Sequence, residues 1–228
     1  MTNKTDLAYD RIESMLVSGA LAPGRFIATY ELQAMLDMGR TPVHQAVTRL
    51  AGEALIIIKP RHGLQIAPID LKREHLLLQL RRDVECFVVQ LATERASTAQ
   101  RKEMIKLCAQ LKSTKTMSLA KFNVIDHRID QLFLEAANEP YVAATLRPLH
   151  TLFRRIGWLY HSQTAQATAL QASVDGHMAV LEAVASNQVK QAVRATDALM
   201  NFVDDMFDTL HAELKPEQLD CNASTTAE

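Results

Sequence analysis

The sequence predicts a mainly α-helical protein in two parts: a small N-terminal part with one β-hairpin, and a larger all-α antiparallel helical bundle. Apolar residues recur at helical spacing through most of the 228 residues. Strand-like character, an apolar β-branched run followed by alternation, is confined to residues 54–69. Hydrophobic residues make up 48% of the chain, with only seven glycines and seven prolines, so the composition favours a packed globular protein.

Three helical segments precede the hairpin. The first is expected over residues 6–18, before the string SGALAPGRF interrupts the pattern with two glycines and a proline. Thr29 is placed to cap a second helix over residues 30–37. After a two-residue turn, we expect Thr41 to cap the third helix. Pro42 would then occupy its first position, where a missing N–H costs nothing.

The order helix, helix-turn-helix and hairpin is that of a winged helix-turn-helix domain, which we assign to residues 1–69. The second helix of such a motif enters the major groove of DNA. Taken alone, the polar start of this helix would fit a solvated cap. The basic hairpin tip, residues 59–63, favours DNA binding instead. The candidate DNA-binding residues are Tyr30, Arg40, Thr41, His44, Gln45, Thr48, Arg49, Arg61, His62 and Gly63.

The charge of the N-terminal part is only mildly positive. Residues 1–69 hold seven Lys and Arg against six acidic residues, and the whole chain carries a net charge of -1. One copy would therefore bind phosphates weakly, which favours a homodimer on a palindromic site in double-stranded DNA.

The remainder of the chain is expected to form six helices with short connections, which implies antiparallel neighbours. We assign residues 70–214 to this all-helical domain, expected to bind an effector and to dimerise, and residues 215–228 to a disordered tail. The expected helices cover residues 71–96, 98–112, 118–137, 140–161, 165–186 and 188–214.

Other features limit location and activity. Three scattered cysteines fit a reducing cytosol better than a disulfide framework. The N-terminus lacks an apolar signal core, and no apolar run reaches the length of about 20 residues that spans a bilayer, so we expect a cytoplasmic protein without membrane contact. The chain shows no nucleophile motif, phosphate loop or CxxC, so we do not expect an enzyme.

The string SGALAPGRFIATYELQAMLDMGRTPVHQAVTRLAGEALI resembles the GntR family of bacterial transcription regulators, whose usual string is close to SGxLxPGxxLxxxxLAxxLGVSRTPVREALxRLxxEGLV. The strings LRRDVECFVVQLATERAS, IDHRIDQLFLEAANEPYV and DGHMAVLEAVASNQVKQA resemble helices of the FCD-type effector domain in the FadR subgroup. The resemblance implies a dimeric, ligand-responsive regulator. Where the family usually has Arg-Glu in the reading helix, this chain has His44-Gln45, so its operator is expected to differ.

The resemblance also implies a divalent metal, such as zinc, held by one Asp and three His. Asp126 and His177 match two of these positions, whereas Asp130 and Leu199 replace the other two histidines. Asp126, Asp130 and His177 form an incomplete metal set, to which His127 or His150 could add an imidazole, although His127 lies one residue off the helix face of Asp126. Alternatively, arginines neutralise the two aspartates and no metal binds.

A metal-free cavity could take an organic acid, because arginine binds carboxylates through two parallel hydrogen bonds. The candidate effector-binding residues are Arg81, Arg154, Asp126, Asp130 and His177. The leading interpretation is a transcriptional regulator, usually a repressor in this family, that senses a small metabolite. The alternatives are a DNA-binding protein whose helical domain only dimerises, and a metal-dependent hydrolase.

Overall fold

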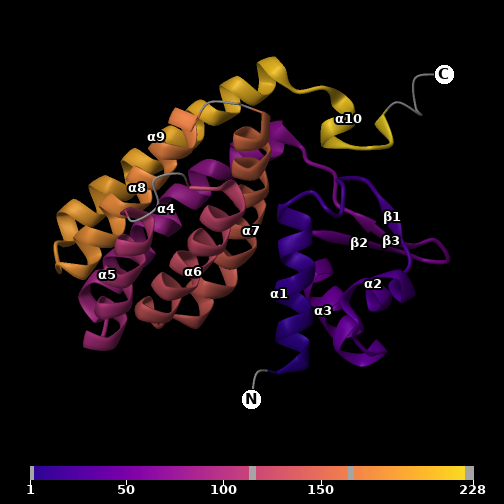
Figure 1. Cartoon of the computed structure of the whole chain (residues 1–228), viewed down its shortest axis with the longest axis horizontal. Coiled ribbons are helices and arrows are strands. Elements are labelled where there is room, and N and C mark those ends of the chain that lie inside the picture. Colours follow the sequence, from indigo (N-terminus) through magenta and orange to yellow (C-terminus); the bar gives the residue numbers. More distant parts are fainter. Residues whose placement is uncertain (1–2, 113–116, 164–166, 224–228) are drawn as a thin grey trace. The chain divides into compact units, whose positions relative to one another are not determined.

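The computed structural model describes residues 3–112, 117–163 and 167–223 (Figure 1). The chain divides into two compact units, of which one joins residues 1–71 to residues 212–228 and the other comprises residues 72–211. The predicted fold class, a winged helix-turn-helix followed by an all-α bundle, is confirmed.

The first unit contains three long helices and a small antiparallel sheet with strand order β1-β3-β2 (Figure 1). In the sheet, Lys59 pairs with Gly63 across the hairpin and Phe26 pairs with Gln65. The elements are α1 (Lys4–Val17), β1 (Phe26–Ile27), α2 (Thr29–Leu36), α3 (Arg40–Gly52), β2 (Ile56–Lys59) and β3 (Gly63–Ile66). The sequence did not predict β1, because a strand of two residues after a Gly-Pro turn is too short to alternate.

Two expected helix caps were wrong by one or two residues. The N-cap of α2 is Ala28, whose backbone N–H donates to the Glu31 carboxylate at 3.0 Å, so Thr29 is the first helical residue. The N-cap of α3 is Gly39, so Thr41 lies within the first turn. Both helices thus begin without a side-chain cap from their own N-cap residue, which is why the Ser/Thr rule failed there.

The core of this unit lies between α1, α3 and the sheet. Fully buried apolar side chains come from every element, so the three helices and the sheet pack as one structure and fix how the exposed face of α3 is presented. The largest of them are Ile12, Leu16, Leu21, Leu32, Leu50, Leu55, Ile56 and Ile66.

The C-terminal segment is not the disordered tail that we predicted, as far as Ala223. Residues Pro216–Leu219 form the short helix α10. The backbone N–H of Ile69 donates to the carbonyl of Leu219 at 2.8 Å, and that of Cys221 donates to the carbonyl of Pro23 at 2.9 Å. Main-chain hydrogen bonds of this kind leave no apolar periodicity in the sequence, so the prediction missed them. Residues 224–228 lie outside the described part of the chain.

The second unit consists of the six predicted helices (Figure 1). Their boundaries agree with the prediction within two residues, except that residues 165–166 are not described. The helices are α4 (Leu71–Arg95), α5 (Thr98–Lys112), α6 (Leu119–Ala137), α7 (Pro140–Gln163), α8 (Ala167–Ala185) and α9 (Val189–Glu213). In the described residues, no helix is both long and apolar enough to cross a membrane.

Candidate functional site

The exposed face of α3 carries most of the candidate DNA-binding residues. Arg40, Thr41, His44, Gln45 and Thr48 follow one another at helical spacing, and all five are exposed. Val43, Ala46, Val47 and Leu50 are buried on the other side and hold the helix to the core. The helix can therefore offer its polar face to a DNA groove without losing its packing.

Two of the predicted residues of α3 contact α1. The Thr5 hydroxyl donates to Gln45 Oε1 at 2.6 Å, and the second residue is Arg49. Its guanidinium lies over the Tyr9 ring at 3.7 Å and forms ion pairs with Glu53 at 3.3 Å and Asp6 at 3.7 Å. These contacts draw the side chain toward α1 and give it a structural role, and its contact with DNA stays a prediction. Helical spacing could not predict this, because Tyr9 lies on another helix.

The other predicted DNA-binding residues lie on two further elements. Tyr30, near the start of α2, is 71% exposed. Arg61 and His62 are exposed at the tip of the β2–β3 hairpin. Gly63 has a φ of 86°, which permits the tight turn, so its role is to shape the tip. The structure thus supplies a reading helix, a flanking helix and a basic wing.

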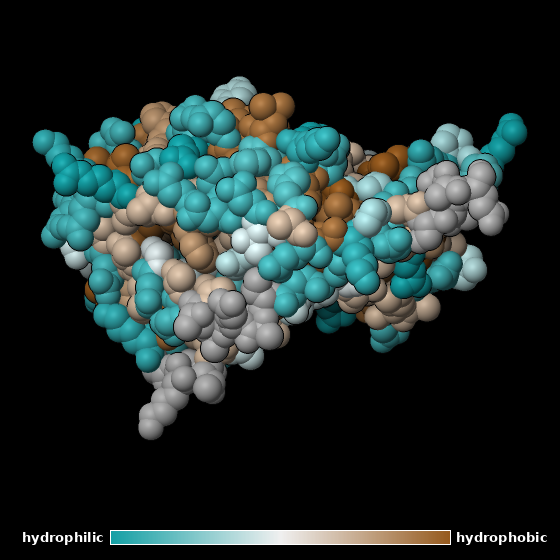
Figure 2. Space-filling view, turned by 90° about the horizontal axis from the view of Figure 1, so that it is seen from above, coloured by the Kyte–Doolittle hydropathy of each residue, from teal (hydrophilic) through white to brown (hydrophobic). Residues whose placement is uncertain are grey.

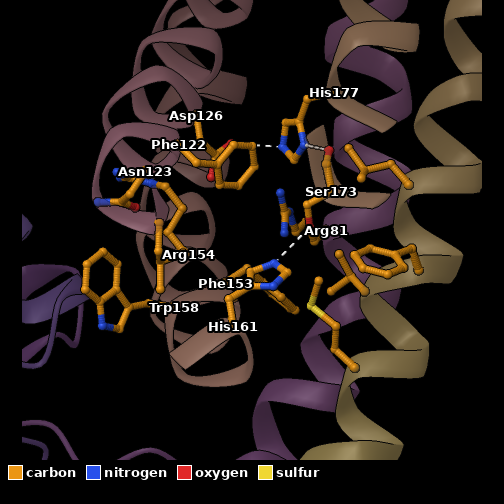
Figure 3. A pocket seen from close by; sticks show the side chains of 16 residues that line it. Arg81, Phe122, Asn123, Asp126, Phe153, Arg154, Trp158, His161, Ser173 and His177 are labelled. Carbon is orange, nitrogen blue, oxygen red and sulfur yellow. Dashed lines mark hydrogen bonds and ion pairs between the residues drawn. The ribbon is translucent and has the colours of Figure 1, made fainter. Parts of the chain in front are cut away.

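A cavity of about 50 Å³ lies in the second unit, where side chains from α4, α6, α7, α8 and α9 meet (Figure 3). Its volume is several times the 10–15 Å³ or so that one water needs, so it suits a small ligand. The predicted effector residues Arg81, Arg154, Asp126 and His177 line it, whereas Asp130 does not.

Asp126 and His177 face each other at one end of the cavity (Figure 3). Nε2 of His177 lies 2.9 Å from the Asp126 carboxylate, while its Nδ1 lies 2.7 Å from the Ser173 carbonyl. Burial alone would raise the pKa of Asp126, but His177, Arg154 and Arg81 lower it below the usual range. Burial likewise opposes a charge on His177, yet Asp126 raises its pKa. The two side chains form a buried ion pair.

Asp130 belongs to a second group of buried charges. Its carboxylate lies 3.4 Å from Arg154 Nε and 3.6 Å from His150 Nε2. His150 Nε2 also lies 2.9 Å from the Glu85 carboxylate. Burial raises the pKa of Asp130 to about 6, and the charge of Asp126 adds to this effect, while His150 and Arg154 oppose it. Asp130 therefore already interacts with the basic side chains of His150 and Arg154.

The metal set predicted from the sequence does not fit this geometry. Asp126 and His177 pair with each other, but Asp130 turns to Arg154 and His150. Leu199 offers no ligand atom; its side chain packs so closely against Gly176 that a Cβ there would lie 2.8 Å from it. Throughout the described residues, no three His, Cys, Asp or Glu side chains are grouped as a metal site requires. Side chains of the protein therefore pair with the two aspartates that the family pattern would place on a metal: His177 with Asp126, and Arg154 with Asp130.

Several cavity residues were missed by the sequence analysis. His161 and Ser173 share a hydrogen bond of 2.9 Å, and both line the cavity (Figure 3). Burial and the nearby His177 lower the pKa of His161 to about 4, so its imidazole is neutral at pH 7. Phe122 and Phe153 supply apolar wall. No local pattern marks these residues, because they meet only when α6, α7 and α8 pack together.

The surface seen in Figure 2 is mainly hydrophilic and carries several smaller hydrophobic patches. On α4, three large apolar side chains are exposed: Leu76, Leu80 and Phe87, at 77%, 46% and 48%. Their spacing of four and seven residues places them on one face of the helix, which we call the α4 stripe. Aligned exposed apolar residues of this size indicate a contact surface.

Comparison with known proteins agrees with both units. Residues 4–66 match the gntR family of bacterial regulatory proteins, and residues 76–202 match the FCD domain. HTH-type transcriptional regulators from Streptomyces ambofaciens and Agrobacterium vitis are each 33% identical to the chain, over 69 and 67 residues or 30% and 29% of it. The match spans only 29% and 39% of the length of these relatives.

Solved structures show the same fold over most of the chain. Escherichia coli McbR/YncC superposes with a TM-score of 0.78 at 17% identity, covering 92% of this chain and 100% of that one. A GntR transcriptional regulator from Rhodococcus sp. RHA1 gives a TM-score of 0.66 at 15% identity, covering 94% and 100%. A winged helix-turn-helix followed by a helical domain with a polar cavity defines the class of two-domain bacterial transcription regulators. The chain belongs to the gntR family and carries an FCD domain. The relatives that it matches are transcriptional regulators and not enzymes.

Proposed function

We propose that the protein is a repressor that binds a palindromic operator as a homodimer and responds to a small organic acid in the FCD cavity. As a DNA-binding regulator, it would act in the cytoplasm, where the chromosome lies. This proposal rests on the surroundings of Arg81, a residue that is 9% exposed and lines the cavity. Among the described residues, its two terminal nitrogens have no hydrogen-bond partner. A buried guanidinium with free donors favours an anionic ligand.

The alternative of a purely structural helical domain is weaker for the same reason. A domain that only dimerises has no need for a cavity lined by five ionisable groups: Arg81, Asp126, Arg154, His161 and His177. The metal-dependent hydrolase that the sequence left open is set aside, because the family consists of regulators and the metal set is not assembled.

The test is operator binding measured with and without organic acids, on DNA taken from the intergenic region next to the gene. We expect at least one acid to weaken operator binding by wild type, and Arg81→Lys to reduce that response while operator binding without acid is retained. An affinity that no acid changes would contradict the ligand-responsive function and leave the structural alternative.

A further inference from the structure

The hydrogen-bond donors of the Arg81 guanidinium indicate which chemical group of the effector this residue binds. Its Nε lies 3.4 Å from the Glu85 carboxylate, and its guanidinium carbon lies 4.8 Å from the centre of the Phe153 ring. These contacts fix the plane of the guanidinium, which lies between His177 and His161 in Figure 3. A fixed planar fork with two free nitrogens matches the two oxygens of one carboxylate.

The remaining charges around the cavity are already paired. Asp126 is paired with His177, and Asp130 is paired with Arg154. A second carboxylate on the ligand would have to compete with Asp130 for Arg154 and would approach the negative charge of Asp126. The charge pattern therefore admits one negative charge.

Most of the remaining wall of the cavity is apolar. Four side chains of α9 face it, Leu199, Phe202, Val203 and Met206, and the uncharged polar residues of the wall are Asn123, Ser173 and His161. Polar groups of a ligand placed against these residues would lose water without gaining hydrogen bonds, whereas apolar groups gain by burial.

We infer that the effector is a small monocarboxylic acid with an apolar body, whose carboxylate is held by Arg81 without a metal. This inference deepens the proposed function and rests on it. His161 offers such a ligand a further polar contact, because its Nδ1 is buried without a hydrogen-bond partner in the described part of the chain.

Calorimetry and thermal shift on the full-length protein test this inference with benzoate, hexanoate, succinate, citrate and benzyl alcohol, each with and without EDTA. We expect benzoate or hexanoate to bind and EDTA to have no effect. Arg81→Lys keeps the charge but loses the fork and should weaken binding by about 10- to 100-fold. Arg82→Met is the matched control, because Arg82 is the next residue of α4, pairs with Asp197 and does not line the cavity.

Tighter binding of succinate or citrate, or binding that EDTA abolishes, would overturn the inference while leaving a ligand-responsive regulator intact. Equal binding of the acid by wild type and Arg81→Lys would also overturn the inference and leave a ligand-responsive regulator intact. If none of the acids binds or changes operator affinity, both the inference and the proposed function fail.

A second inference rests on the C-terminal segment. Helix α9, which lines the cavity, continues to Glu213, and the short helix α10 that follows belongs to the first unit. The amide nitrogen of the Asn222 side chain donates to the Gly24 carbonyl at 2.7 Å, beside the bond from Cys221 to Pro23. Gly24 has a φ of 81°, and a Cβ there would collide with the Asp220 carboxylate, so the contact needs glycine at this position.

We infer that residues 214–223 form a strap that transmits changes in α9 to the DNA-binding unit. The chain passes from one unit to the other at residues 71–72 and again at residues 211–212. The hydrogen bond from Ile69 to Leu219 links the segment before the first passage to the segment after the second. Two chain connections therefore link the units instead of one. A second connection lowers the conformational entropy that a dimer loses when it binds two half-sites at once.

The strap can be loosened in the full-length protein by combining Cys221→Pro with Asn222→Ala. Proline removes the N–H that bonds to Pro23, and the extended backbone of Asp220 already suits a following proline. We expect operator affinity to fall by about threefold or more relative to Cys221→Ser, which keeps that N–H. Unchanged affinity, with normal thermal stability, would overturn the strap whatever the effector proves to be.

Discussion

Arg40 and Arg49 are the same residue type on the same helix, yet their surroundings differ. Arg40 is exposed in the first turn of α3, whereas Arg49 is held over Tyr9 by a cation–π contact and two ion pairs. A sequence pattern gives the helix and the residue type, but it cannot say which arginine finds a partner on another helix. The same limit applies to Asp130, which the pattern placed with Asp126 and the structure gives to Arg154.

We expect Arg40→Ala to weaken operator binding by roughly 1–3 kcal/mol and to relax base preference, because an arginine that reads guanine loses two hydrogen bonds. Fluorescence anisotropy with operator and scrambled duplexes measures both effects. Arg49→Ala is the paired variant. It should lower the stability of the first unit by about 1 kcal/mol and change DNA affinity much less. Equal losses of affinity in the two variants would show that Arg49 also contacts DNA.

Glu85 should give the second unit a stability that depends on pH. Burial opposes its ionisation, but His150 and Arg81 outweigh burial and lower its pKa from 4.5 to about 2. A carboxyl group whose pKa falls on folding stabilises the folded state above its unfolded value. That contribution is lost as the pH falls through the folded value.

We therefore expect Glu85→Gln to lower the free energy of unfolding at pH 7 by about 3 kcal/mol. The difference from wild type should shrink as the pH falls from 4.5 toward 2. Urea denaturation at several pH values measures it, with Glu94→Gln as the control, since Glu94 is exposed on the same helix. A difference that stays constant down to pH 2.5 would mean that Glu85 is not ionised in the folded protein.

Among the helices and strands, the sequence predicts those whose apolar residues recur at regular spacing. All six helices of the second unit, the three helices of the first unit and the hairpin were identified, because each buries a regular apolar face. The strand β1 and the helix α10 were not, because they are two and four residues long and are held by main-chain hydrogen bonds. The cavity was predicted only through family resemblance, since its walls come from five helices that are far apart in sequence.

The contact of α1 with α3 determines whether the reading helix is presented correctly. Leu50 of α3 is fully buried in this core. We expect Leu50→Ala to destabilise the first unit by about 2–5 kcal/mol, through lost burial and the cavity left behind. Thermal denaturation followed by near-ultraviolet circular dichroism measures this loss. Met35→Ala, at an exposed position of α2, should cost far less, and an equal cost at both positions would contradict the assigned core.

At the scale of the whole molecule, the proposed homodimer needs a surface that joins two copies. The first unit has only a small excess of positive charge, so one copy offers few phosphate contacts. The α4 stripe of Leu76, Leu80 and Phe87 is the contact surface that we assign to a second copy. Burying it in a two-fold interface would remove apolar surface from water and place a winged unit on each half-site.

Leu80→Glu should therefore shift the protein from dimer to monomer, because a charge at the centre of an apolar interface loses its water without gaining a partner. Sedimentation equilibrium gives the dissociation constant of the dimer, which we expect to rise by about 100-fold or more. Operator affinity should fall with it, while affinity for a single half-site stays the same. Ile105→Glu is the control, because Ile105 is exposed on α5, outside the stripe. A dimer that survives Leu80→Glu unchanged would place the interface elsewhere. A wild-type protein that binds the full operator specifically as a monomer would contradict the homodimer itself.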